Sequence, residues 1–202
     1  MTHLDNLIEE ICSLSNYFTS DNSRVKSSSL LGGDCGILLV HSLLHEHMPN
    51  LDTKNFLEQK VHSLISFIEA ESSLSASYCD GLAGVGWLLL YLQEKSLINL
   101  AADDFFADLD VFLVDSLDQY LAERNHDLLH GALGVGLYFL KRNNHSQVEK
   151  IIDYLYINCD KSDLEIKWAS WDKNSEQHVY NFGLAHGHAG ILYFLGKCCK
   201  GK

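Results

Sequence analysis

The sequence predicts an all-α fold in which an inner layer of helices is wrapped by an outer layer, as in an α/α barrel or solenoid. A G-x-x-G element recurs four times along the 202 residues. Segments that are apolar almost all round follow these elements, and amphipathic segments lie between them. The apolar runs contain Leu, Tyr and Phe rather than Val and Ile, which favours helices over the alternative of a parallel α/β sheet.

Four repeat units organise the chain. They are centred on Gly33, Gly81, Gly131 and Gly187, so successive units begin 48, 50 and 56 residues apart. A period near 50 residues indicates repeated supersecondary units. We interpret the glycines as mainly structural, because a small residue lets backbones approach closely and tolerates unusual dihedral angles before a helix. They are not a dinucleotide fingerprint, since no strand and no suitably placed acidic residue accompany them.

Each unit is expected to contain one buried helix and one amphipathic helix. The buried helices follow the G-x-x-G elements, because a helix that is apolar on every side is normally covered on every side. The amphipathic helices carry apolar residues at spacings of three and four. Their stripes are Leu4, Leu7, Ile8 and Ile11; Leu57, Val61, Leu64, Ile65 and Ile68; Phe106, Leu109, Leu113, Leu117, Tyr120 and Leu121; and Val148, Ile151, Ile152 and Leu155.

Residues 160–180 break this pattern. Trp168 and Trp171 lie there among Lys, Asp, Ser and Asn residues, without a helical stripe. We interpret the segment as a long loop with room for a short hairpin. Because long loops in compact domains often carry function, both tryptophans are candidates for the lining of a substrate cleft.

Composition limits the class of partner. The chain has 27 acidic residues against 15 Lys and Arg, a formal charge of -12. A field of that sign opposes binding to nucleic acid and to anionic membrane surfaces. The N-terminus lacks the basic and apolar regions of a secretory signal, and no apolar run is long enough to insert into a bilayer. We therefore expect a cytoplasmic protein with one partial α/α-barrel domain over residues 1–202, whose six cysteines are mostly free and buried.

A polar residue precedes the first glycine in three of the units, namely Asp80, His130 and His186. If the inner helices point the same way around a ring, these side chains gather at one mouth, where helix N-termini add partial positive charge. A histidine at a helix start is commonly a hydrogen-bonded structural residue, and that interpretation also applies to His188. The shared position in several units favours a functional role.

Residues 183–191 (G-L-A-H-G-H-A-G-I) and residues 127–138 (D-L-L-H-G-A-L-G-V-G-L-Y) resemble the lanthionine synthetase C-like family, the cyclases of lanthipeptide biosynthesis. The similarity covers essentially the whole chain. Members of the family are toroids with seven inner and seven outer helices. The resemblance therefore implies an α/α toroid of which this chain holds about four of seven repeats, as an open half-ring.

The family adds a peptide cysteine thiol to a dehydroalanine or dehydrobutyrine, so the resemblance implies a precursor peptide as partner. In the complete ring a zinc ion lowers the pKa of that thiol. His186 matches the motif histidine that serves as an acid, a base or an enolate-stabilising group, and Asp127 matches an aspartate that works with it. These two residues are the catalytic candidates. The candidates for the substrate cleft are Asp80, His130, His188, Trp168 and Trp171.

The zinc ligands of the family do not carry over. They come from a W-C-x-G and a C-H-G segment, and this sequence contains neither. Cys198 and Cys199 are a poor substitute, because adjacent cysteines rarely direct both sulfurs to one tetrahedral centre. We therefore predict no metal site in this chain, zinc only in the complete ring, and an activity that is incomplete here. An open half-ring exposes apolar faces, which favours self-association or pairing with a C-terminal half.

Two alternatives remain at this stage. The chain could be a non-catalytic peptide-binding or scaffold module that keeps the cleft without the metal. It could also be another α/α-barrel enzyme such as a glycoside hydrolase, with Asp80 and Asp127 as paired carboxylates facing one cleft.

Overall fold

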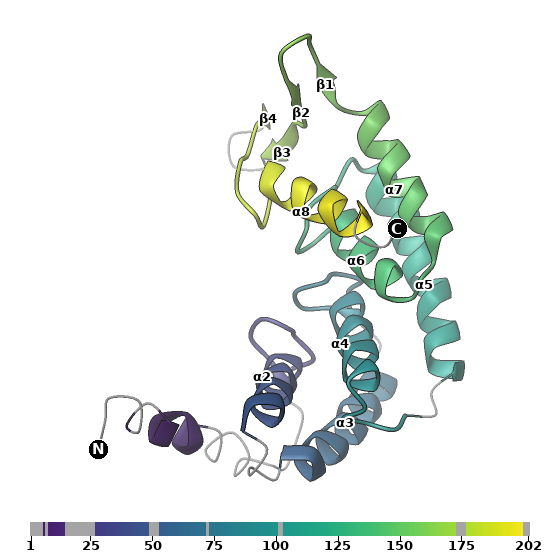
Figure 1. Cartoon of the computed structure of the whole chain (residues 1–202). Helices are drawn as coiled ribbons and strands as arrows, with labels where there is room; N and C mark the ends of the chain where they lie inside the picture. Colours follow the sequence, from purple (N-terminus) through teal and green to yellow (C-terminus); the bar gives the residue numbers. More distant parts are fainter. Residues whose placement is uncertain are drawn as a thin grey trace.

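The computed structural model describes residues 6, 8–14, 27–48, 53–71, 73–100, 103–172 and 177–199, without the side chains of residues 171 and 172. A helix begins directly after the first glycine of each G-x-x-G element, and amphipathic helices lie between these helices. Figure 1 shows the helices that begin at the G-x-x-G elements along an arc, with the amphipathic helices on the outer side of the arc. The inner helices are α2 (Asp34–His47), α4 (Leu82–Glu94), α6 (Ala132–Lys141) and α8 (His188–Cys199), and the outer helices are α3 (Thr53–Ala70), α5 (Asp103–Ala122) and α7 (His145–Ile157).

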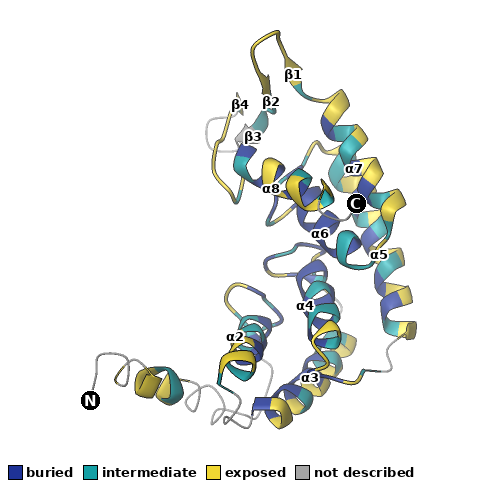
Figure 2. Ribbon diagram, in the orientation of Figure 1, coloured by how far each residue is buried: buried dark blue, intermediate teal, exposed yellow. Residues whose placement is uncertain are grey.

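The predicted stripes of the outer helices face the core. Leu57 and Leu64 of α3, Leu113 and Leu117 of α5, and Ile151 of α7 are fully buried. Figure 2 shows buried and exposed residues alternating along these helices, as expected where one face is solvated. The N-terminal stripe is only partly within the described residues: residues 8–14 are helical, with one stripe position exposed and one half-buried, and the first two positions of the stripe lie outside.

The inner helices differ in how fully they are covered. In α6 nearly every apolar side chain is buried, and in α4 more than half are buried and the others half-buried, because each of these helices packs between other inner helices. Towards the two ends of the arc the prediction of helices buried on all sides is wrong. Val40 and Leu43 of α2 and Leu192 and Tyr193 of α8 are exposed. Within the described chain, α2 packs on α3 and α4, and α8 packs on α6, so one side of each helix meets solvent.

The paired glycines are required by close backbone approach. Gly33 caps α2 with a φ of -132°, an extended conformation open to any residue, so dihedral freedom is not the reason for glycine. A Cβ on Gly33 would lie 2.6 Å from the carbonyl oxygen of Ser27, and a Cβ on Gly36 would lie 2.7 Å from that of Leu30. The corresponding glycines of the other three units also meet the carbonyl of the residue six positions earlier. Each entry loop therefore folds tightly against the start of its own helix.

Hydrogen bonds join each entry loop to the next. In each case the amide of the residue three positions before the first glycine donates to the carbonyl of the residue two positions before the first glycine of the following unit. These bonds run from Leu30 to Cys79 (2.8 Å), from Tyr78 to Leu129 (2.9 Å) and from Leu128 to Ala185 (3.2 Å). The four loops thus lie side by side at one end of the inner helices. Figure 1 shows this end for α2 and α4, where the loop before each helix is visible.

The long loop predicted between α7 and α8 contains two short antiparallel hairpins. The first pairs β1 (Asp160–Lys161) with β2 (Ile166–Lys167), and the second pairs β3 (Ser170–Asp172) with β4 (Gln177–Val179). In the described residues these are the strands found, so the parallel α/β alternative is wrong. No helix of the described residues has the length and apolar character needed to cross a membrane.

The cysteines are free, as predicted, but most are not buried. Cys35 and Cys79 are buried, whereas Cys12, Cys159 and Cys198 are half-buried and Cys199 is exposed. Burial of the cysteines could not be predicted from the repeat, because five of the six cysteines lie outside the G-x-x-G elements.

A buried histidine in α2 makes stability depend on pH. His41 is 1% exposed and packs on the ring of Phe56, with ring centroids 4.3 Å apart. Neither of its ring nitrogens has a hydrogen-bond partner among the described residues. Burial lowers the pKa of His41, and burial also lowers the pKa of His126. Both rings are therefore kept neutral by the folded state.

We expect the free energy of unfolding to fall as the pH drops below about 6.5, the value for an unperturbed histidine, because the unfolded chain then binds more protons than the folded chain. In urea titrations at pH 8 and pH 5, His41→Phe should reduce this loss, with the remainder due to His126. His62→Gln, a change at an exposed position of α3, should leave the loss unchanged. An equal loss in His41→Phe and in the unsubstituted chain would contradict the assignment.

Candidate functional site

The entry loops bring residues from three units together at one mouth. Asp80 and Cys79 come from the loop before α4, Asp127 and His130 from the loop before α6, and His186 from the loop before α8. They meet because the hydrogen bonds between successive loops place equivalent positions next to one another.

Asp127 and His186 form a hydrogen-bonded pair. One carboxylate oxygen of Asp127, Oδ1, accepts hydrogen bonds from the amides of Leu129 (2.7 Å) and His130 (2.8 Å), which fix the side chain at the start of the turn. The other oxygen, Oδ2, lies 2.5 Å from Nδ1 of His186. Because an ionised carboxylate only accepts, Nδ1 of His186 carries the proton of this bond. Nε2 is thereby left as the nitrogen that can exchange a proton with a bound molecule.

The exposure of the pair fits such an exchange. The side chain of Asp127 is 19% exposed and that of His186 is 52% exposed. The carboxylate is thus held by the protein, whereas the imidazole reaches solvent. A carboxylate that orients an imidazole and stabilises its charged form is a common arrangement for general acid–base chemistry.

His130 links this pair to the preceding unit. Its ring lies nearly parallel to that of His186, with centroids 6.0 Å apart and an interplanar angle of 15°. Its Nδ1 is 3.7 Å from Oδ1 of Asp127, and its Nε2 is 3.0 Å from Sγ of Cys79. The His130 ring therefore stands between Asp127 on one side and Cys79 on the other.

Asp80 is held by hydroxyl groups of its own entry loop. Its Oδ1 accepts one short hydrogen bond from the hydroxyl of Ser77 and a longer one of 3.5 Å from that of Ser75. The hydrogen bond from Ser77 lowers the pKa of the Asp80 carboxyl, against the opposing effect of burial. Asp80 is therefore ionised at neutral pH and lies beside His130 and Cys79.

His188 and Trp168, two predicted cleft residues, lie apart from this cluster. Nδ1 of His188 donates to the carbonyl of Asn181 (2.6 Å), and Nε2 accepts from the amide of Trp168 (3.1 Å). The indole Nε1 of Trp168 donates to the carbonyl of Leu155 in α7 (2.8 Å). These bonds attach the hairpin segment to the helices, so both side chains have structural partners.

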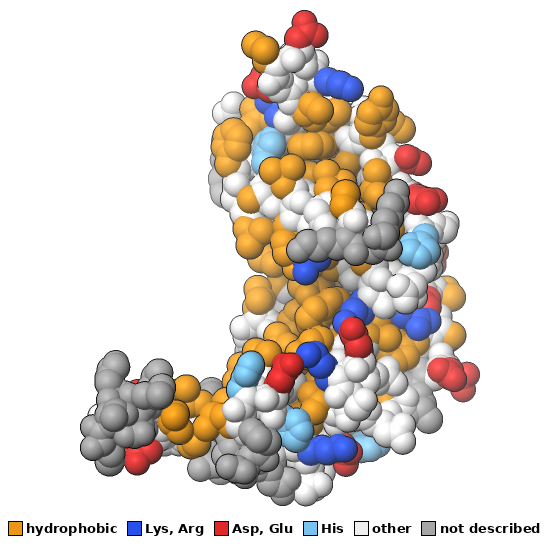
Figure 3. Space-filling view, viewed as in Figure 1, with side chains coloured by type: hydrophobic (Ala, Val, Ile, Leu, Met, Phe, Trp, Pro, Cys, Tyr) orange, Lys and Arg blue, Asp and Glu red, His pale blue; other side chains and the backbone are white. Residues whose placement is uncertain are grey.

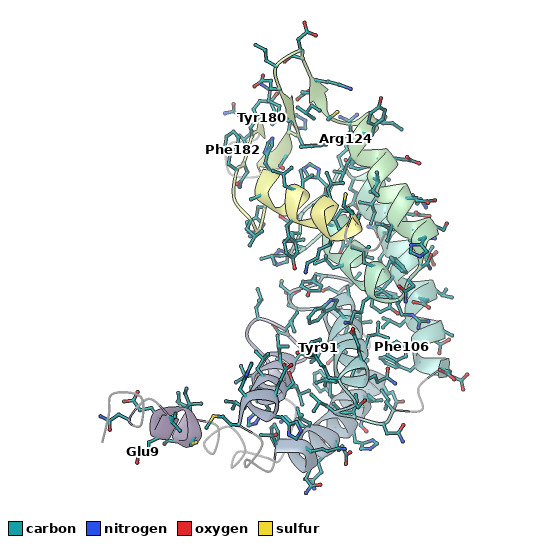
Figure 4. All side chains as sticks on the ribbon, viewed as in Figure 1. Glu9, Tyr91, Phe106, Arg124, Tyr180 and Phe182 are labelled. Atoms are coloured by element: carbon teal, nitrogen blue, oxygen red, sulfur yellow. The ribbon has the colours of Figure 1, made fainter. Side chains whose placement is uncertain are left out.

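The aromatic residues that lead into α8 complete this anchor. The ring of Phe182 stacks on His188 with centroids 4.9 Å apart, and Figure 4 shows Tyr180 and Phe182 in the segment before the helix. Trp171, the remaining cleft candidate, belongs to β3, and its side chain lies outside the described part of the structure.

Cys79 is the member of the mouth cluster that sequence reasoning missed. It is 5% exposed, and its thiol lies against the half-exposed His130 from the next unit. Cys79 lies two residues before Gly81. This position predicts a place at the mouth only if the repeats are already known to stack with equivalent positions in contact.

Two groups of donor atoms at the mouth could hold a metal ion. They are Cys79, Asp80 and His130, and Asp127, His130 and His186, with the donor atoms of each group within 4.8 Å of one another. The first group combines a thiol, a carboxylate and an imidazole, which are the ligand types that zinc takes in proteins.

A cleft lies between α4, α6, α7 and α8. Its volume is about 480 Å³, and its walls include Tyr78, Trp87, Leu137, Lys141 and Tyr193. Among the lining residues, Tyr78 belongs to the loop before α4 and precedes Cys79 in the sequence. Figure 3 shows hydrophobic side chains gathered along the hollowed side of the arc. The walls of this cleft combine apolar side chains with the charged side chains of Lys141, Glu149 and Lys197.

Comparison with known proteins gives the family. The model of the lanthionine synthetase C-like protein family matches residues 24–202. The chain belongs to this family. Among solved structures, a nisin cyclase aligns with a TM-score of 0.66 at 20% sequence identity, covering 94% of this chain and 52% of that one. The chain thus shares the toroid fold and spans about half the length of the nisin cyclase. No curated protein sequence matches it.

Membership of the lanthionine synthetase C-like family bears on the remaining alternatives. Asp80 and Asp127 do lie at the same mouth, on either side of His130. However, Asp127 is paired with His186 and two backbone amides, and the sequence around these residues matches a family of cyclases rather than of glycoside hydrolases. The family assignment therefore favours the cyclase-like interpretation.

Proposed function

We propose that this chain acts in lanthionine-cyclase-like modification of a precursor peptide in the cytoplasm, with Asp127 and His186 as the proton-transfer pair. The observation that supports this most directly is the 2.5 Å contact between Oδ2 of Asp127 and Nδ1 of His186 at a solvent-accessible mouth. Membership of the lanthionine synthetase C-like family supports the class of substrate.

The reaction joins a cysteine of the peptide to a dehydroalanine or dehydrobutyrine of the same peptide. The thiol gives up its proton to water, the sulfur forms a bond to the β-carbon, and the π electrons move to the adjacent carbonyl oxygen as an enolate. The α-carbon then takes a proton from Nε2 of His186, and the carbonyl is restored. One proton leaves sulfur and one reaches carbon, so the step needs no oxidant or reductant.

The mouth has the charge distribution that this reaction needs. Asp127 accepts the hydrogen bond from Nδ1 of His186 and thereby orients the imidazole, which leaves Nε2 to transfer the proton. The N-termini of α6 and α8 begin at the same mouth, and their partial positive charge favours the negative enolate oxygen. His186 therefore needs to supply only the proton.

The cleft beside the mouth is the proposed site for the peptide. Its apolar walls, formed by Trp87, Leu137 and Tyr193 among others, suit the hydrophobic side chains of a peptide. In this proposal the peptide extends from the cleft past Tyr78 to the mouth, where Cys79, Asp80 and His130 would face the reacting segment. In this proposal His188 and Trp168 act indirectly, by positioning the loop that carries His186.

The second half of a ring, or a second copy of this chain, is a further proposed partner. Leu184, Leu192 and Tyr193 are exposed at the end of the arc formed by α8, and the chain covers 52% of the nisin cyclase. In the complete ring a zinc ion would supply activation of the thiol, and no step above is assigned to it.

A non-catalytic peptide-binding module is the second candidate function. It is favoured by one observation, the lack of the W-C-x-G and C-H-G segments in the sequence. It keeps the cleft and the mouth but forms no thioether.

The two candidates can be separated with a synthetic peptide that carries one cysteine and one dehydroalanine. The assay is run with chelator at about pH 8.5, where a substantial fraction of free thiol is ionised without a metal. We expect saturable binding by fluorescence anisotropy and a ring product with a single configuration at the new α-carbon. Ring closure of the peptide alone should give both configurations, because water can protonate either face.

Binding with an unchanged mixture of configurations would establish the non-catalytic module instead. Absence of binding at millimolar peptide would contradict both candidates. The readout is resistance of the cysteine to alkylation, followed by chromatographic separation of the two ring products.

A further inference from the structure

Cys79 has an unusual environment for a buried cysteine. Its side chain is 5% exposed, yet its Sγ lies 3.0 Å from Nε2 of His130 and beside the carboxylate of Asp80. Cys35, the other buried cysteine, lies instead within the apolar core. A buried thiol that faces an imidazole nitrogen and a carboxylate has the surroundings of a metal ligand rather than those of a packing residue.

Hydrogen bonds from neighbouring groups hold Asp80 and Cys79 in place. Ser77 and Ser75 donate hydrogen bonds to Asp80, which orients its carboxylate towards the other two groups. The backbone of Cys79 is tied on both sides, since its amide donates to Leu129 (3.1 Å) and its carbonyl accepts from Leu30 (2.8 Å). Such outer contacts fix the direction of the inner ligands of metal sites.

His130 is supported in the same way. Its Nε2 points at Cys79, while its Nδ1 faces Oδ1 of Asp127 at 3.7 Å. A carboxylate on the far side of an imidazole, opposite the nitrogen that meets the metal, is the usual second partner of a histidine ligand. The contacts of His130 with Cys79 and Asp127 thus favour Nε2 as the nitrogen that binds the metal.

We propose that Cys79, Asp80 and His130 bind a thiophilic divalent cation, with Zn²⁺ as the best fit. Sulfur, nitrogen and oxygen donors from three side chains, together with an exposed face of the mouth, match a zinc site with three protein ligands and one open position. A thiolate and a carboxylate balance the two positive charges. The site goes beyond the proposed function, because no step of the thiol addition described above uses a metal.

The geometry requires only a small adjustment. With zinc bonds of roughly 2.3 Å to sulfur and 2.0–2.1 Å to nitrogen, tetrahedral coordination separates the two donor atoms by roughly 3.5 Å. The observed separation is 3.0 Å, and the side chain of His130 is 51% exposed and can move outwards. Binding releases the thiol proton of Cys79, forms the zinc–sulfur bond and involves no change of oxidation state.

The other group of donors, Asp127, His130 and His186, is less suited to a cation. Both oxygens of Asp127 already accept hydrogen bonds, from two backbone amides and from His186. Binding there would break these bonds and turn His130 away from Cys79. The prediction of no metal site from the sequence considered only the segments that supply zinc ligands elsewhere in the family. A site formed by two entry loops contains neither segment and could not be found in that way.

The proposal is tested by titrating the chelator-treated chain with Co²⁺ alone, followed by competition with Zn²⁺. We expect one Co²⁺ per chain and a near-ultraviolet charge-transfer band that reports a thiolate ligand. Cys79→Ser should abolish the band, and His130→Gln should weaken Co²⁺ binding by more than roughly 100-fold. Cys159→Ser, at a half-buried cysteine that donates to the carbonyl of Tyr156 away from the mouth, should leave the band unchanged.

Three outcomes would overturn the proposal: no charge-transfer band in the unsubstituted chain, a band that persists in Cys79→Ser, or loss of Co²⁺ binding in His186→Ala but not in Cys79→Ser. Far-ultraviolet circular dichroism of each variant without metal shows whether the variant is folded. His130→Gln changes a half-exposed side chain, so this variant provides a second test if Cys79→Ser unfolds. The peptide assay is run with chelator, so failure of the metal site and failure of the proposed function are seen separately.

Discussion

His186→Ala is expected to bind the dehydrated peptide as tightly as the unsubstituted chain and to yield both configurations of the ring product. The substitution removes the only proposed proton donor but leaves the cleft walls unchanged, since His186 lies in the entry loop at the mouth. The rate of ring closure above that of the peptide alone should fall by about 10²–10⁴-fold, the usual contribution of a positioned acid or base.

Asp127→Asn should have nearly the same effect by a different route. The amide oxygen can keep the hydrogen bonds from Leu129 and His130, but the amide nitrogen would donate to Nδ1 of His186. The proton of the imidazole is then held on Nε2 and the charged form loses its partner. The double substitution should cost little more than either single one, because the two residues act as a unit.

The matched controls are His62→Ala and Asp108→Asn, both at exposed positions of outer helices. They change the same residue types without touching the mouth and should preserve the single configuration. If His186→Ala also gave a single configuration, proton transfer by this pair would be wrong even if the rate had dropped.

Helix positions could be predicted from the sequence because periodicity is a local property. Leu57, Leu64, Leu113 and Leu117 recur at helical spacing, and all four are fully buried in α3 and α5. The exposure of Leu192 and Val40 could not be predicted in this way. Whether the second side of an apolar helix is covered depends on neighbours that the local pattern does not specify.

The mouth was partly predictable because the repeat aligns equivalent residues. Asp80, His130 and His186 share a position before the first glycine, and the hydrogen bonds between entry loops bring that position together in space. The pairing of Asp127 with His186 was inferred from the family resemblance, and its distance needed the structure.

Contacts between non-equivalent positions could not be predicted. Cys79 meets His130 from the next unit although the two occupy different positions of the repeat. His188 was a candidate for the substrate cleft, but its two ring nitrogens are hydrogen-bonded to the backbone of Asn181 and Trp168. Side-chain direction at a helix start, which the sequence pattern does not fix, decides both cases.

Gly134→Ala is expected to destabilise the chain by about 3 kcal/mol, at the upper end of the range for overpacking. The added Cβ would lie 2.6 Å from Cβ of Tyr78 and would also meet the carbonyl oxygen of Leu128. The first contact lies between units and the second within one unit. Since one partner is backbone and the other is the root of a side chain, neither can move away by changing rotamer.

Gly196→Ala is the matched control. Gly196 lies in α8, and a Cβ there would meet no atom within 4 Å. In an exposed helix interior, alanine is favoured over glycine by about 0.5–1 kcal/mol, so this variant should be slightly more stable. Urea unfolding of the two variants and the unsubstituted chain, followed by circular dichroism, measures the opposite shifts. Equal midpoints for Gly134→Ala and the unsubstituted chain would show that the entry loop can yield.

The reason for expecting a large loss is that the entry loops are coupled. Tyr78 donates its amide hydrogen to the carbonyl of Leu129, next to the Leu128 carbonyl that the new methyl group would meet. Moving either loop to make room strains this bond between units and displaces Cys79, which follows Tyr78. The same close approach that excludes a side chain at Gly134 therefore holds the thiol of Cys79 against His130, and the stability of the repeat and the geometry of the mouth depend on one contact.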